Sequence, residues 1–146
     1  MKRTATLVLT VCLCLMCAAC AAETAAEQRP VDLDLSLLSG TVVYAEVYNI
    51  MYDPQSYLGK VIRIRGLYSV FEEPSTGVVY HACVIPDATA CCMQGMEFVP
   101  PAGGLPAEEG ETVTVTGRLA IYQEGGVSWL HLVDTDVVCS GDSGAS

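Results

Sequence analysis

A succession of five strand-like segments constrains the fold of this chain more than any other feature. Apolar and polar residues alternate along several of them, which indicates strands with one face buried and the other exposed. Turn-rich sequence separates the segments, which cover residues 61–70, 78–85, 91–99, 111–122 and 127–138. Gly66 interrupts the first segment as the glycine of a β-bulge would. Five short strands, the first of them bent, within about 80 residues favour a small closed barrel over a sandwich.

One helix is predicted ahead of the strands, over residues 41–51. Its apolar face is formed by residues at spacings of three and four, namely Val43, Val47, Ile50 and Met51. Ser39 or Thr41 suits the start of the helix as a cap. Asp53-Pro54 ends it, because the residue before a proline avoids the helical conformation.

The N-terminus has the pattern of a secretory signal. A short basic start at residues 1–3 precedes an apolar run, and small residues end the run before the first acid, Glu23. Cys20 follows Ala18 and Ala19, and this sequence resembles the lipobox of bacterial lipoproteins, in which the cysteine becomes the lipidated first residue. We therefore expect Cys20 to carry a lipid that anchors the chain to the cell membrane.

Two alternatives to lipidation remain open. Ala19-Cys20-Ala21 also fits an A-x-A cleavage site, which would release a secreted, soluble protein. An uncleaved apolar run of about 20 residues is long enough to span a bilayer. All three alternatives place the folded part outside the cytoplasm, where disulfides are permitted.

The chain divides into four predicted parts. Within the second part Leu33, Leu35 and Leu37 alternate with polar residues, as in a short strand at which packing begins. The parts are a lipoprotein signal peptide over residues 1–19, a tether over 20–38, a β-barrel domain over 39–139 and a disordered tail over 140–146.

The charge of the chain excludes one large class of function. After residue 20, five basic and 17 acidic residues give a formal charge of −12. Nucleic-acid binding needs a basic face that neutralises phosphates, so we expect no nucleic-acid partner. An acidic surface also repels anionic lipids, so attachment to a membrane would depend on the lipid anchor.

Three segments resemble OB-fold proteins exported by bacteria. The sequence D-P-Q-S-Y-L-G-K-V-I-R-I-R-G at residues 53–66 resembles the opening of such domains, and E-G-E-T-V-T-V-T-G-R-L at 109–119 resembles a later strand. Residues 81–98 resemble a group of uncharacterised Gram-positive OB-fold lipoproteins and, more weakly, the YcgQ-like partners of two-component permeases. The resemblance covers residues 41–138 and implies a mainly β protein, a five-stranded OB-like barrel with an N-terminal helix, preceded by a signal peptide. The YcgQ-like group implies metal handling and a membrane-protein partner.

Three of the eight cysteines lie in the hairpin predicted for residues 78–99. If its strands pair around residues 86–90, Cys83 lies opposite Cys92 or close to it, His81 shares the Cys83 face, and Cys91 points to the other face. A structural disulfide from Cys83 to Cys92 or Cys91 fits this arrangement and is favoured by the oxidising compartment. A Zn²⁺ or Cu⁺ site that includes His81 also fits, and so does thiol redox chemistry.

The sequence contains no motif of a catalytic site. It has no Ser-His-Asp order, no phosphate-binding loop and no H-E-x-x-H, so we expect a binding protein and not an enzyme. The expected function is that of a membrane-anchored exported module that binds a metal or small ligand, or serves a membrane partner. The alternative is a structural or interaction module whose cysteines form only disulfides.

Overall fold

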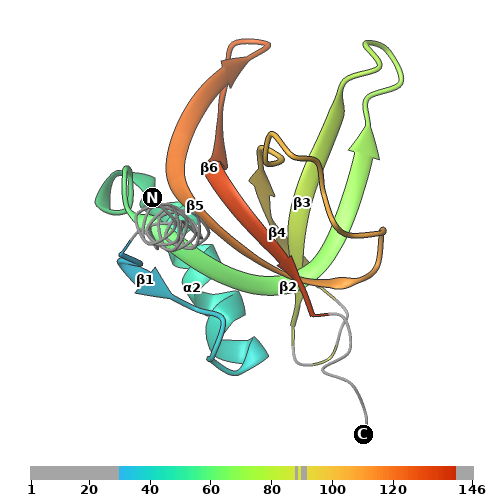
Figure 1. Ribbon diagram of the computed structural model, residues 1–146. Helices are drawn as coiled ribbons and strands as arrows, with labels where there is room; N and C mark the ends of the chain where they lie inside the picture. Colours follow the sequence, from blue (N-terminus) through green and yellow to red (C-terminus); the bar gives the residue numbers. More distant parts are fainter. Residues whose placement is uncertain (1–29, 88, 90–91, 141–146) are drawn as a thin grey trace, which may run out of the picture.

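Five strands wrap into a barrel in the computed structural model, which describes residues 30–87, 89 and 92–140 (Figure 1). Each observed strand of the barrel begins and ends within two residues of its predicted segment. The strands are β2 (Val61–Glu72), β3 (Val79–Pro86), β4 (Met93–Phe98), β5 (Thr112–Glu124) and β6 (Val127–Cys139), preceded by β1 (Leu33–Asp34), helix α2 (Gly40–Tyr52) and a 3₁₀ turn (Pro54–Ser56).

The strand order closes the sheet on itself. Neighbouring strands follow the order β2-β3-β4-β6-β5, and β5 returns to pair with β2. The β4–β6 pair is parallel and the other pairs of the barrel are antiparallel, so the barrel is mixed. The predicted fold class is confirmed: the protein is mainly β, with a five-stranded closed barrel and one N-terminal helix.

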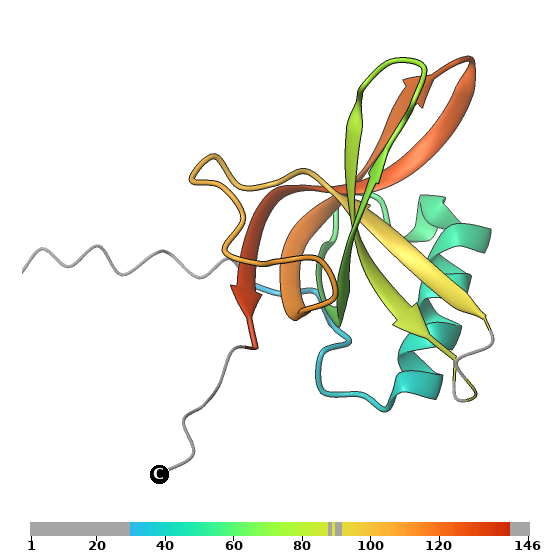
Figure 2. The same cartoon turned by 90° about the vertical axis from the view of Figure 1, so that its right-hand side faces the viewer.

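Helix α2 lies alongside β3 and β4 and covers one end of the core (Figure 2). Its apolar face buries Val43, Val47 and Ile50 as predicted, whereas Met51 is 41% exposed, because it lies about 100° round the helix from Ile50. Ser39 is the N-cap residue but makes no side-chain capping bond, and the helix ends at Asp53. Within residues 30–87, 89 and 92–140, no helix is long and apolar enough to cross a membrane.

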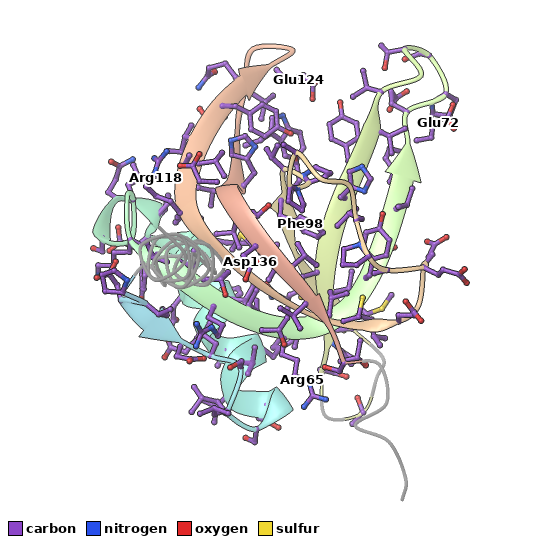
Figure 3. All side chains as sticks on the ribbon, viewed as in Figure 1. Arg65, Glu72, Phe98, Arg118, Glu124 and Asp136 are labelled. Atoms are coloured by element: carbon purple, nitrogen blue, oxygen red, sulfur yellow. The ribbon has the colours of Figure 1, made fainter. Side chains whose placement is uncertain are left out.

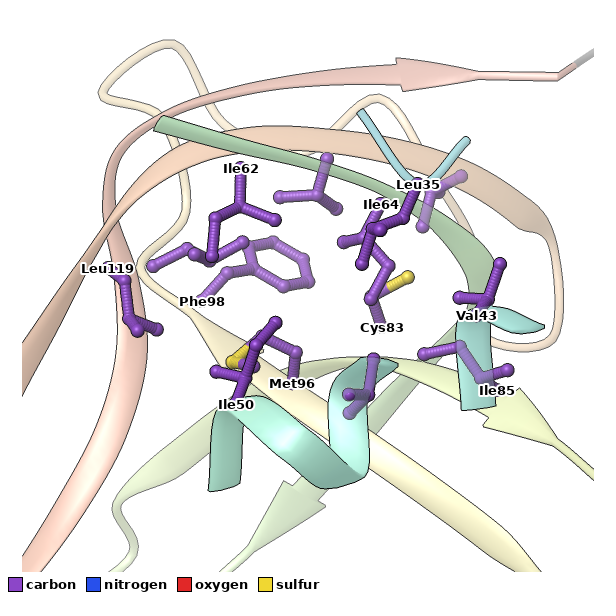
Figure 4. Close-up of a cluster of buried hydrophobic side chains, with 14 of the residues drawn as sticks. Leu35, Val43, Ile50, Ile62, Ile64, Cys83, Ile85, Met96, Phe98 and Leu119 are labelled. Carbon is purple, nitrogen blue, oxygen red and sulfur yellow. The ribbon is translucent and has the colours of Figure 1, made fainter. Parts of the chain in front are cut away.

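The folded unit begins earlier than residue 39. Strand β1 pairs in parallel with β2, and Arg63 forms a 3.0 Å ion pair with Asp34 beside that pairing. Leu35 is fully buried in the core that Figure 4 shows, next to side chains of the barrel and of α2. The last residues of the predicted tether are therefore part of the packed domain.

Strand β2 changes its partner close to Gly66. Residues 61–67 pair with β5, and residues 67–72 pair with β3. A Cβ atom on Gly66 would lie 2.5 Å from the carbonyl oxygen of Val84 and 2.8 Å from the Sγ of Cys83. The glycine is therefore required by the close approach of β3. The predicted bulge at Gly66 is wrong, because the β2–β5 register continues through it, and the register shift lies between Thr116 and Arg118 of the β5–β6 pair.

Because β3 approaches Gly66 closely, adding one methyl group there should destabilise the fold more than adding one at another strand glycine. Gly66→Ala should lower the free energy of unfolding by about 1–3 kcal/mol, because neither the Val84 backbone nor the buried Cys83 can move away freely. Gly95→Ala on β4 is the matched control, since its Cβ would meet only ordinary contacts at 3.8 Å and should change stability by less than about 0.5 kcal/mol. Urea unfolding of both variants measures the difference. Equal free energies of unfolding would contradict the conclusion that the close approach of β3 requires a glycine at position 66.

Candidate functional site

The observed register of the β3–β4 hairpin separates the predicted cysteine pair. Cys83 lies opposite Met96, and the hairpin closes at Pro86 opposite Met93. The carbonyl of Cys92 accepts a hydrogen bond from the amide of Asp87, so Cys92 lies beside Asp87 and not beside Cys83. Asp87 is four residues along the chain from Cys83, which corresponds to roughly 13 Å of strand. A disulfide needs Cα atoms about 4.4–6.8 Å apart. The predicted register, with Cys83 opposite Cys92, is therefore wrong.

Cys83 is a core residue. Its side chain is fully buried and its thiol is free, and burial raises the pKa of the Cys83 thiol to about 12. A thiol that stays protonated is a weak nucleophile and a poor metal ligand. Cys139, at the end of β6, donates its thiol hydrogen to the carbonyl of Pro106.

The two other described members of the predicted cysteine site, His81 and Cys92, do not form a metal site with Cys83. His81 lies on the same strand, but its Nδ1 is 2.7 Å from the Tyr68 hydroxyl and its ring stacks on the Tyr68 ring. Burial lowers the pKa of His81. Cys92 is exposed at the far end of the hairpin, and Cys91 lies outside the described residues. Over residues 30–87, 89 and 92–140, no group of three or more His, Cys, Asp or Glu side chains could hold a metal ion.

The β2–β3 and β5–β6 hairpins project from the barrel (Figure 1). A cleft of about 240 Å³ lies between the side chains of these two hairpins, away from the predicted cysteine site. Strand β4 joins the two hairpins at their base through only two residue pairs with β6, Glu97–His131 and Phe98–Leu132. The hairpins diverge beyond this short joint. The side chains that line the cleft are aromatic or acidic: Phe71, Tyr80, Tyr122 and Trp129, with Glu73, Glu97 and Glu124.

Each hairpin contributes one cross-strand aromatic pair to the cleft. Phe71 and Tyr80 are directly opposite each other, with ring centroids 6.3 Å apart, and Tyr122 is directly opposite Trp129. Phe71 is 58% exposed and Trp129 48% exposed. Large aromatic side chains that remain this exposed and line a common concavity are typical of ligand-binding surfaces.

Two tyrosines hold two of the three carboxylates of the cleft in place. The Tyr80 hydroxyl on β3 donates a 2.7 Å hydrogen bond to Glu124 Oε1 on β5, and so links the two hairpins. The Tyr122 hydroxyl donates a 2.8 Å bond to Glu97 Oε2. Figure 3 shows Glu124 near the tip of one hairpin and Glu72 near the tip of the other.

These hydrogen bonds leave the cleft negatively charged. The bond to Glu124 raises the pKa of Tyr80 to about 12, and burial followed by the bond to Glu97 raises the pKa of Tyr122, so both phenols stay protonated as neutral donors. No lysine or arginine is among the lining residues that the structure describes. Elsewhere in the described part of the chain, Arg63 and Arg118 form ion pairs with other carboxylates, and Lys60 lies over the Tyr57 ring.

His131 lies next to two of the residues that line the cleft. Its ring centroid is 4.6 Å from that of Tyr122, and its Nδ1 is 4.0 Å from Glu97 Oε1. That distance is too long for a hydrogen bond, so Glu97 is held chiefly by Tyr122.

A second cavity, of about 350 Å³, lies between the start of α2 and strands β2 and β3. Although it is larger, Arg65 is the single charged side chain among its described lining residues, and it has no aromatic wall. The concentration of aromatic and acidic groups makes the smaller cleft the stronger candidate site.

The cleft was not predicted from the sequence. Its residues come from all five strands of the barrel and from the β2–β3 turn, and barrel closure brings them together. The segments F-E-E-P and Y-Q-E-G-G-V-S-W could have indicated it. Each has an aromatic residue beside a hairpin turn, next to acidic residues, at a position where a half-buried strand usually has a polar side chain. Comparisons of the chain with protein-family models, curated proteins and solved structures find no match.

The burial of Cys83 predicts how its thiol reacts. At pH 9, the ordinary pKa of a cysteine, a thiol reagent should modify native wild-type protein and the Cys83→Ala variant to the same extent, because Cys83 stays buried and protonated. After denaturation without reductant, the wild type should show one more reactive thiol than the variant. A count one lower in the wild type than in the variant would instead mean that Cys83 is held in a disulfide, because the substitution would release its partner thiol.

Proposed function

We propose that this protein is an extracytoplasmic, membrane-anchored lipoprotein whose OB-like barrel binds a small ligand in the cleft between its two hairpins. The observation that carries the proposal is the cleft itself, with four aromatic and three acidic side chains around about 240 Å³. We propose a binding role and not a catalytic one; the tyrosines of the cleft, held as neutral donors to carboxylates, support this.

The exposed aromatic rings favour this binding function over a purely structural one. A structural module gains nothing from leaving Phe71 and Trp129 half exposed, since burying such side chains stabilises a fold by about 1.5–3 kcal/mol each. OB folds bind their ligands through the two hairpin connections that correspond to β2–β3 and β5–β6 here, which is an argument from fold analogy. The acidic lining repels phosphates, in agreement with the expectation of no nucleic-acid partner.

The membrane anchor and the partner rest on the sequence. Cys20 after Ala18-Ala19 supports lipidation, and the resemblance to Gram-positive exported OB-fold lipoproteins supports the same location. The weaker resemblance to YcgQ-like proteins supports a membrane-protein partner. A Zn²⁺ or Cu⁺ function has less support, because Cys83 is buried in the core and His81 is bonded to Tyr68.

The cleft should be where small molecules bind. A fragment library of cationic, neutral and anionic compounds, screened by NMR on the purified protein, should give hits that shift the resonances of Phe71, Tyr80, Tyr122 and the Trp129 indole. Hits that shift instead the residues of the second cavity, such as Leu35 and Ile85, would contradict the assignment of the site.

Lipidation at Cys20 predicts a change of location on substitution. Cys20→Ser should move the protein from the membrane fraction to the soluble fraction, because the serine has no thiol to carry the lipid. Fractionation, together with mass spectrometry of the N-terminal peptide, measures the change. A Cys20→Ser protein that stays in the membrane fraction would indicate a retained apolar anchor, and a wild-type protein found only in the soluble fraction would indicate cleavage and secretion.

A further inference from the structure

We propose that the ligand group bound in the cleft is an alkylammonium cation, with a quaternary or otherwise methylated nitrogen. The inference rests on the proposed binding function and specifies the chemistry that the cleft recognises. It follows from three properties of the lining: uncompensated negative charge, several accessible ring faces and small volume.

The charge of the cleft selects against anions and favours a cation. Glu73, Glu97 and Glu124 line it; neutral tyrosine hydroxyls donate to Glu97 and Glu124, and His131 Nδ1, 4.0 Å from Glu97 Oε1, is beyond hydrogen-bond distance. Each carboxylate offers about four lone-pair sites, of which a tyrosine uses one. The negative charge is therefore held in place by the fold without being neutralised by it.

The aromatic walls favour an organic cation over a metal ion. A cation within about 6 Å of an aromatic centroid is attracted by the ring, most strongly by tryptophan, and quaternary ammonium groups are typical ligands of such sites. Ca²⁺ instead takes about six to eight oxygen ligands at short range, and no metal-binding group is found among the described residues. Phe71 and Trp129 give a metal ion nothing to coordinate, but they offer ring faces to N-methyl groups.

The size of the cleft fits a small alkylammonium group and not a large ligand. Its volume of about 240 Å³ is below the about 300–1,000 Å³ of sites that enclose drug-sized molecules. A trimethylammonium group with a short alkyl arm suits this space. Because such a group has no N–H donor, it enters an aromatic cleft without losing strong hydrogen bonds to water.

The fluorescence of the single tryptophan of the chain can measure binding in the cleft. Trp129 lines the cleft and is the only tryptophan in the sequence, so its fluorescence reports on the site without labelling. We expect choline and tetramethylammonium to change the Trp129 emission saturably. Choline should bind about tenfold more tightly than 3,3-dimethylbutan-1-ol, its uncharged isostere of the same shape, because only the cation interacts with the carboxylates and the ring quadrupoles. N-acetyl-lysine methylamide tests whether a primary ammonium group on a peptide serves as well as a free quaternary one.

Matched variants separate the charge from the shape of the cleft. Glu97→Gln/Glu124→Gln keeps an acceptor for each tyrosine and removes two charges, so it should weaken choline about tenfold or more while leaving the uncharged isostere unaffected. Asp136→Asn on the outer part of β6 removes one charge away from the cleft and should change neither affinity. Phe71→Leu keeps an apolar side chain but removes a ring face, so it should weaken choline several-fold more than the isostere.

Two results would overturn the inference. Equal affinity for choline and its isostere, with no effect of the glutamate substitutions, would remove the cation as the ligand while leaving the cleft as a binding site. No saturable change of Trp129 emission with any cation would also overturn it, and the fragment mapping by NMR would then decide separately whether the cleft binds anything.

Discussion

The structure depends on strand β2 changing its partner at Gly66 and Leu67. The first half of this strand closes the barrel against β5, and the second half leaves β5 to form a hairpin with β3. The change is sharp because the β3 backbone at Val84 comes so close that only glycine fits beside it. One strand therefore both closes the core and carries a hairpin away from it.

The cleft is a consequence of this arrangement. Strands β2, β5 and β6 are each 12 or 13 residues long, whereas β4 has only six, so the long strands continue past the point at which β4 holds the two hairpins together. The hydrogen bond from Tyr80 to Glu124 then ties one hairpin to the other across the gap. Because the donors are phenols and not basic groups, this tie fixes the spacing of the hairpins and leaves the glutamate charges available. Rigid aromatic walls with fixed charges are a preorganised site, which loses little conformational entropy on binding.

The fold could be predicted from the sequence because its signals are local. Apolar alternation identified the strands, and Asp53-Pro54 located the end of the helix. The β3–β4 register could not be predicted in the same way. Pairing Cys83 with Met96 instead of Cys92 shifts the register by four residues, and a shift by an even number keeps every side chain on its face, so alternation cannot distinguish the two. The observed register is the one that buries Met96 and Phe98 beside Cys83.

The candidate site was harder to predict than the fold, because Phe71 and Trp129 lie 58 residues apart in the sequence and meet only after the barrel has closed. Residue type was also a poor guide. Cysteines and a histidine were predicted as ligands, whereas Cys83 packs in the core and His81 is a hydrogen-bond partner of Tyr68. An aromatic residue beside a glutamate at a strand end has no such conspicuous chemistry. Its importance comes from its exposure, which is a property of the folded chain.

The central claim is that the two hairpins form a site for an organic cation, and intermolecular nuclear Overhauser effects test it most directly. The N-methyl protons of bound choline should show effects to ring protons of Trp129, Phe71 and Tyr122, since these rings line the cleft. Effects confined to side chains of the second cavity, such as Leu38 and Val43, or to the outer surface of α2, would contradict the account.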